Sequence, residues 1–108
     1  MSRRRPMERL GDLIPEAARR LGLEEELRLA RAISTWSAIV GERVPAAAGA
    51  SRLVRIEAFT LVVEADAPIV AQELRLRTPE LLEAFGSAPG GIRGRDLRVR
   101  VRREGPAV

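Results

Sequence analysis

The sequence predicts one small α+β domain, with elements in the order α, α, β, β, α, β and a three-stranded sheet covered on one face by helices. Its 108 residues are enough for one ordinary domain and too few for two. Apolar residues recur at helical spacing in the N-terminal half, whereas short runs rich in Val, Ile and Leu occupy much of the C-terminal half. With 45% apolar and 31% charged residues, the chain has the composition of a folded protein.

Two helices are predicted before any strand. The first has Asp12 as a candidate N-cap, Pro15 within its first turn and Gly22 at its end. Its apolar face is formed by Leu10, Leu13, Ile14, Ala17 and Leu21. The second helix runs from about Glu24 to Val44 and ends at Pro45. Its apolar stripe consists of Leu29, Ile33, Trp36, Val40 and Val44.

A β-hairpin and a third helix are expected next. The segments Arg52–Ala58 and Phe59–Ala65 are rich in strand-forming residues, and the turn between them lies near Glu57–Thr60. Asp66-Ala67-Pro68 is typical of a helix start, and an apolar face follows it. Thr78-Pro79 interrupts this helix, so the proline either kinks it or restarts it with Thr78 as a new cap.

A glycine-rich loop at residues 86–94 leads to the last predicted strand, Asp96–Arg103. Within the loop, Gly91-Ile92-Arg93-Gly94 has the form of the GxxG loop with which KH domains clamp nucleic-acid backbones. Two glycines arise easily in such a loop, and a KH clamp joins two helices rather than a helix and a strand. An ordinary turn is therefore the preferred interpretation.

The composition excludes several chemistries. The chain contains no Cys, His, Lys, Tyr or Asn, so all 19 basic residues are arginine. Without Lys there is no Walker lysine or Schiff base, and without His and Cys the usual zinc sites and Ser-His or Cys-His nucleophiles are missing. The 15 acidic residues show no recognisable catalytic pairing. We therefore expect a protein that is not an enzyme and uses no metal or cofactor.

The expected compartment is the cytoplasm, and no membrane partner is expected. A chain without Cys is typical of a reducing compartment, and the apolar stretches are far shorter than the ~20 residues that span a bilayer. The segment Met1–Glu8 has three arginines and no apolar region, so it is interpreted as a short basic arm rather than a signal peptide.

Positive charge gathers at both ends of the chain. Residues 1–5 carry three Arg (+3), residues 6–91 carry ten Arg against 13 acids (−3), and residues 92–108 carry six Arg against two acids (+4). Clustering of this kind is the electrostatic signature of a phosphate-binding surface. Nucleic acid is therefore the expected ligand.

The last predicted strand indicates how its arginines would be arranged to bind a nucleic acid. Side chains alternate along a strand, so Arg98, Arg100 and Arg102 should share one face while the apolar residues between them face the core. Their spacing of about 6.6 to 6.8 Å is comparable to the phosphate repeat of an extended single strand. The alternative is a solvated edge strand whose charge prevents unwanted pairing. The predicted nucleic-acid-binding residues are Arg52, Arg55, Arg93, Arg95, Arg98, Arg100, Arg102 and Arg103.

Aromatic residues make up 3% of the chain. Trp36 lies on an apolar helix stripe, which favours a core position over a partner-facing one. Proteins that read single strands normally stack bases on aromatic side chains. With Trp36, Phe59 and Phe85 alone, such a platform is missing, and binding is expected to be mainly to the backbone.

Three stretches together resemble the DciA-like proteins of bacteria: Trp36–Val44, then Leu61–Glu64 leading to Ala71–Leu76, and finally Leu97–Val101. The resemblance covers roughly Leu10 to Arg103. It implies a KH-like domain that binds DNA and acts on the replicative DnaB-type helicase, assisting its loading without an ATPase of its own. It also implies a division into a basic N-terminal arm (1–9), the KH-like domain (10–103) and a short C-terminal tail (104–108).

The leading hypothesis is thus a DNA-binding adaptor that assists loading or regulation of the replicative helicase. Its partners would be single-stranded or forked DNA, or RNA, and, by resemblance, the DnaB-type helicase. The helical layer, acidic through Glu24, Glu25 and Glu26, would be free for the protein partner. Two alternatives remain open: an RNA-binding KH-like module, and a structural interaction domain that binds no nucleic acid.

Overall fold

The protein is described by a computed structural model that covers the backbone of residues 6–102 and the side chains of residues 15–102. Within residues 6–102 it has three helices, one 3-10 turn and a three-stranded sheet, which confirms the predicted α+β class. In chain order the elements are α1 (Pro6–Arg43), η1 (Pro45–Ala47), β1 (Ser51–Glu57), β2 (Thr60–Ala65), α2 (Pro68–Leu76), α3 (Thr78–Ser87) and β3 (Asp96–Val101).

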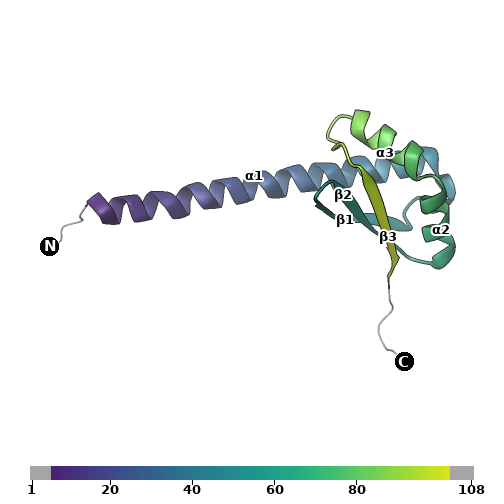
Figure 1. Ribbon diagram of the computed structural model, residues 1–108, viewed down its shortest axis with the longest axis horizontal. Coiled ribbons are helices and arrows are strands. Elements are labelled where there is room, and N and C mark those ends of the chain that lie inside the picture. The colour runs from purple at the N-terminus through teal and green to yellow at the C-terminus, as the bar shows by residue number, and fades with distance from the viewer. Residues whose placement is uncertain (1–5, 103–108) are drawn as a thin grey trace, which may run out of the picture.

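The sheet has the order β1-β2-β3 and is mixed. Strands β1 and β2 form an antiparallel hairpin, whereas β2 and β3 are parallel and are joined by a crossover through α2 and α3. The C-terminal half of α1 packs on β1, and α2 and α3 pack on β3 (Figure 1). The helices therefore cover one face of the sheet, as predicted, and leave the other face open.

One apolar cluster fills the space between the helices and the sheet. Trp36 lies at its centre with no exposed surface, and its ring meets that of Phe85 edge to face, with centroids 5.8 Å apart and planes at 81°. Such aromatic pairs stabilise a core beyond their buried area. The prediction that Trp36 is a core residue is confirmed.

Helix α1 is continuous, so the two N-terminal helices predicted from the sequence are one. Gly22 does not end the helix, and Pro15 lies inside it rather than in its first turn. The composition around Gly22 is rich in Ala, Leu, Arg and Glu, the best helix formers, whereas one glycine costs only about 1 kcal/mol. Packing of the C-terminal half on the core adds tertiary stabilisation to the same helix.

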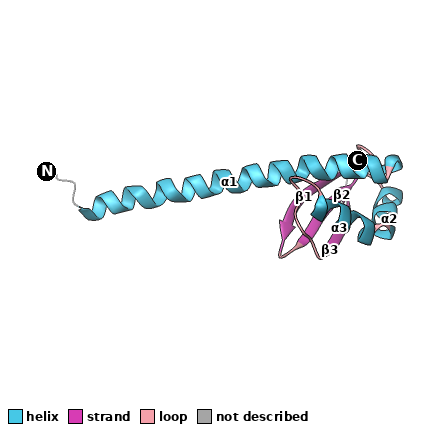
Figure 2. Ribbon diagram, turned by 90° about the horizontal axis from the view of Figure 1, so that it is seen from above, coloured by secondary structure: helices cyan, strands magenta, loops and turns pink. Residues whose placement is uncertain are grey.

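The N-terminal half of α1 projects away from the domain (Figures 1 and 2). All side chains from Pro15 to Arg28 are exposed, and we call this segment the α1 arm. Glu16 and Arg19, and Glu25 and Arg28, form ion pairs one turn apart, which support an exposed helix. The arm explains why the longest dimension of the molecule is 65 Å.

The predicted third helix is divided in two at Thr78-Pro79. Pro79 restarts the chain as α3, because a proline is tolerated in a first turn and not in a helix interior. The predicted cap is wrong in detail, since Arg77 occupies the N-cap position and makes no side-chain cap. The Thr78 hydroxyl instead donates to the carbonyl oxygen of Leu74, at 3.4 Å.

The hairpin turns at Ala58 and Phe59, as predicted. Both residues have positive φ, 48° and 68°. A two-residue turn of this form fits the twist of the flanking strands, and its central positions favour Asn and Gly. Here two ordinary side chains occupy them. A register shift between Leu53 and Arg55 adds a β-bulge to β1.

Candidate nucleic-acid interface

The alternation predicted for the last strand is confirmed between residues 97 and 100. In β3 the side chains of Leu97 and Val99 are buried under the helices, whereas Arg98 and Arg100 are exposed. Arg102 follows directly after the strand, and its backbone N–H donates to the carbonyl oxygen of Ala65 at 2.7 Å. The open face of the sheet therefore carries the arginines of β3.

Strand register brings arginines of β1 onto the same face. Arg52 is paired with Glu64 and, beyond it, Arg100; Arg55 is paired with Val62 and, beyond it, Arg98. We call this surface the arginine face; it comprises Arg52, Arg55, Arg98 and Arg100. Val62 points to this face and is nevertheless completely buried and outside the main core cluster. We attribute its burial to the aliphatic stems of the arginines on either side.

Carboxylates interrupt the positive charge of the arginine face. Glu64 lies between two arginines, 3.4 Å from Arg52 and 3.5 Å from Arg100. Arg52 also contacts Asp66 at 3.5 Å, and Arg55 contacts Glu57. Among the described residues, Arg98 is the one arginine of this face without a carboxylate within 4.0 Å. A phosphate that approaches three of the four guanidiniums therefore competes with a carboxylate for their N–H donors.

The lowered pKa of Glu57 shows that arginines of the arginine face act together on a nearby carboxylate. Its pKa is lowered from the ordinary value of 4.5, first by the hydrogen bond and charge of Arg55, and further by the charges of Arg98 and Arg100. A carboxylate at this edge thus feels guanidiniums from two different strands. An approaching phosphate would meet the same combined field.

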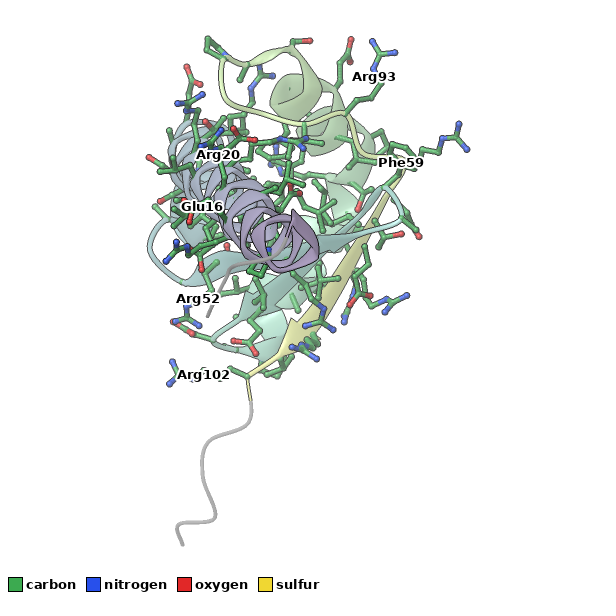
Figure 3. The ribbon with its side chains drawn as sticks, turned by 90° about the vertical axis from the view of Figure 1, so that its left-hand side faces the viewer. Glu16, Arg20, Arg52, Phe59, Arg93 and Arg102 are labelled. Carbon is green, nitrogen blue, oxygen red and sulfur yellow. The ribbon has the colours of Figure 1, made fainter. Side chains whose placement is uncertain are left out.

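The remaining predicted arginines lie at the two ends of the sheet. Figure 3, seen from the N-terminal end of α1, shows Arg93 and Phe59 on one side of the domain and Arg52 and Arg102 on the other. Arg93 and Arg95 are exposed in the loop before β3. Arg103 lies outside the described residues. The structure thus brings four of the eight predicted residues together on one face and places the other described ones at its ends.

A comparison with protein-family models gives one match, to the family described as Dna[CI] antecedent, DciA, over residues 9–99. The match begins within α1 and ends within β3, so it covers nearly all of the described domain. The chain belongs to the DciA family. Membership implies a role in DNA replication with the DnaB-type helicase. No curated protein matches the chain.

The Gly91–Gly94 loop of this DciA-family domain lies between α3 and β3, as predicted. A Cβ at Gly91 would sit 1.8 Å from the carbonyl oxygen of Phe85, so packing alone requires glycine there. The helix–helix junction, where a KH clamp would lie, is the glycine-free step from Leu76 to Thr78. The structure thus supplies a structural reason for the first glycine of this motif.

Sequence reasoning missed one contact, between Phe59 and Arg95. The guanidinium of Arg95 lies over the Phe59 ring, 5.5 Å from its centroid. An aromatic residue at a turn position that favours Asn or Gly was the signal available in the sequence. No group of three or more carboxylates in the described part of the chain is arranged to hold a metal ion. None of its helices is long and apolar enough to cross a membrane.

Proposed function

We propose that this DciA-family protein is an adaptor that assists loading or regulation of the replicative helicase and that it holds DNA on its arginine face. Family membership over residues 9–99 carries the helicase part of the proposal. The convergence of four arginines from β1 and β3 on one open sheet face supports the DNA part. In this proposal the protein acts in the cytoplasm and does not catalyse a reaction.

Binding would proceed by exchange of ion-pair partners. Arg98 is the first contact, because no described carboxylate occupies its guanidinium, and Arg100 follows as a phosphate replaces Glu64. Guanidinium–phosphate hydrogen bonds are charge-assisted and often bidentate, so they are stronger than the exposed ion pairs that they replace. The contacts read no base, and the expected ligands are single-stranded or forked DNA of any sequence.

The helicase would contact the helical side. The α1 arm is exposed throughout, carries Glu24, Glu25 and Glu26, and presents Leu21, Leu23 and Leu27 with more than half of their surface accessible. Leu23 and Leu27 lie one turn apart on the same side of the helix, and an exposed apolar patch rimmed by charged residues can mark a protein-binding surface. The N-terminal part of the arm projects away from the sheet (Figure 2), so a protein bound there would leave the arginine face accessible. At the other end of the arm, Glu25, Glu26 and Arg28 line a hollow together with Arg55 of that face.

The DNA part is tested with the double variant Arg98→Ala/Arg100→Ala. Affinity for single-stranded DNA is measured by fluorescence anisotropy over a range of salt concentrations. Loss of two phosphate contacts should weaken binding and reduce the slope of log K against log salt by about 1.4. A matched control is Arg43→Ala/Arg77→Ala, which removes the same charge from the helical layer, where both arginines pair with Glu80.

Equal losses in the two double variants would mean that net charge alone drives binding and that the arginine face is no site. Competition between RNA and DNA of the same sequence separates the replication role from that of an RNA-binding module, which a strong RNA preference would favour. An affinity pulldown from the native host, with and without nuclease, tests the helicase part. Absence of the replicative helicase from both samples would contradict it.

A further inference from the structure

Phe59 is the exposed aromatic residue of this protein. The chain has three aromatic residues, and the other two, Trp36 and Phe85, are fully buried against each other. Phe59 is 57% exposed at the tip of the hairpin. Its backbone φ of 68°, next to Ala58 at 48°, is strained for any residue with a side chain. Neither burial nor turn geometry therefore accounts for a phenylalanine at this position, and strain of this kind gathers at functional sites.

Arg95 connects Phe59 to the arginine face. Its guanidinium lies over the ring at 5.5 Å from the centroid, and its backbone N–H donates to the carbonyl oxygen of Phe59 at 2.7 Å. Arg95 directly precedes β3, the strand of Arg98 and Arg100. An exposed ring and a row of cations are thus joined through a hydrogen-bonded backbone, without a flexible segment between them.

A hollow of about 470 Å³ lies beside the ring. Leu29, Ile56 and Ile92 make its lining largely apolar, which suits a flat aromatic group. Glu25, Glu26 and Arg28 border it from α1, and Arg55 borders it from β1. Glu25 is paired with Arg28, and Glu26 adds negative charge on the α1 side, so a nucleotide in the hollow would direct its phosphates away from α1, toward Arg55 and Arg95.

We propose that Phe59 stacks one unpaired base of a single-stranded nucleic acid while Arg55 and Arg95 hold the adjoining phosphates. The inference rests on the proposed DNA-binding function and deepens it, because it names the ligand as a strand with an unstacked base. Every base has a π-face, so the contact is independent of sequence. A base paired inside a duplex cannot reach Phe59, so the contact selects single strands and the unpaired arm of a fork.

The test compares two probes with the same number of phosphates, a short oligothymidylate and an abasic oligomer. The wild-type chain should bind the base-bearing probe more tightly, by about 5- to 140-fold for one stacked base. Phe59→Leu keeps an apolar side chain and should lose this preference. Phe59→Trp keeps a ring and should retain it. Circular dichroism of each variant establishes that the domain is folded.

The outcomes separate this inference from the proposed function. If Phe59→Leu retains the full preference, base stacking at the hairpin tip is wrong even where Arg98→Ala/Arg100→Ala still weakens both probes. If no nucleic acid binds at low salt, the proposed DNA-binding function itself fails. If Phe59→Leu abolishes recovery of the helicase and leaves both DNA affinities unchanged, the hollow is a protein-docking site and the inference is overturned.

Discussion

Glu64 offers the sharpest test of the arginine face, because its removal should strengthen DNA binding. The substitution Glu64→Gln keeps the size of the side chain and removes the charge that holds Arg52 at 3.4 Å and Arg100 at 3.5 Å. A phosphate would then meet both guanidiniums without displacing a carboxylate. The variant should lose folding stability and gain DNA affinity.

The size of the effect follows from the two ion pairs. An exposed pair contributes about 0.2 to 1 kcal/mol, so two pairs contribute about 0.4 to 2 kcal/mol. Glu64 is partly buried, with 27% of its side chain exposed, which favours the upper part of that range. Because 1.4 kcal/mol is tenfold in affinity, the gain should be about 2- to 25-fold, with a stability loss of similar free energy.

Glu80→Gln is the matched control. Glu80 also pairs with two arginines, Arg43 at 3.4 Å and Arg77 at 3.6 Å, but on the helical side. Both variants change the net charge equally and lose two ion pairs. Anisotropy titrations give the affinities, and urea unfolding gives the stabilities. If the two variants gain the same affinity, or Glu64→Gln gains none, DNA does not bind at the arginine face.

Three further predictions concern stability. Because the pKa of Glu57 is lowered in the folded state, its interaction with Arg55 stabilises the fold fully above about pH 4.5 and progressively less as the pH falls through the lowered value. The urea midpoint of Glu57→Gln should therefore lie below wild type at neutral pH and approach it in acid; a constant difference would contradict this. Gly22→Ala meets no atom within 4 Å, so far-UV circular dichroism should show more helix while the unfolding midpoint of the packed domain hardly changes. Gly91→Ala would press a Cβ against the Phe85 carbonyl oxygen and should cost about 3 kcal/mol or more in urea unfolding, whereas wild-type stability would disprove the close approach.

The predictable parts of the fold depend on local periodicity. The hairpin, the helix start at Pro68 and the core position of Trp36 follow from patterns within a few residues of each other, and all three are confirmed. The break expected at Gly22 is wrong, because a glycine penalty of about 1 kcal/mol is outweighed by strong helix formers and by a packed continuation of the same helix.

The site depends more on long-range contacts. The sequence gives no sign that Glu64 lies between Arg52 and Arg100, since these partners are 12 and 36 residues away and meet only through strand register. For the same reason, the basic charge counted at the C-terminal end overstates the positive charge of the arginine face. The contact of Phe59 with Arg95 likewise requires the hairpin tip to meet the start of β3.

The sequence by itself determined that Arg98 and Arg100 share a face opposite Leu97 and Val99, because side-chain alternation is a property of any single strand. Only the tertiary structure decided which of those guanidiniums is available. The pairing of β1, β2 and β3 brings carboxylates from distant segments to some arginines and leaves Arg98 without one among the described residues. The sequence alone gives the number and position of the charged residues. Which of them form ion pairs depends on the register of the strands.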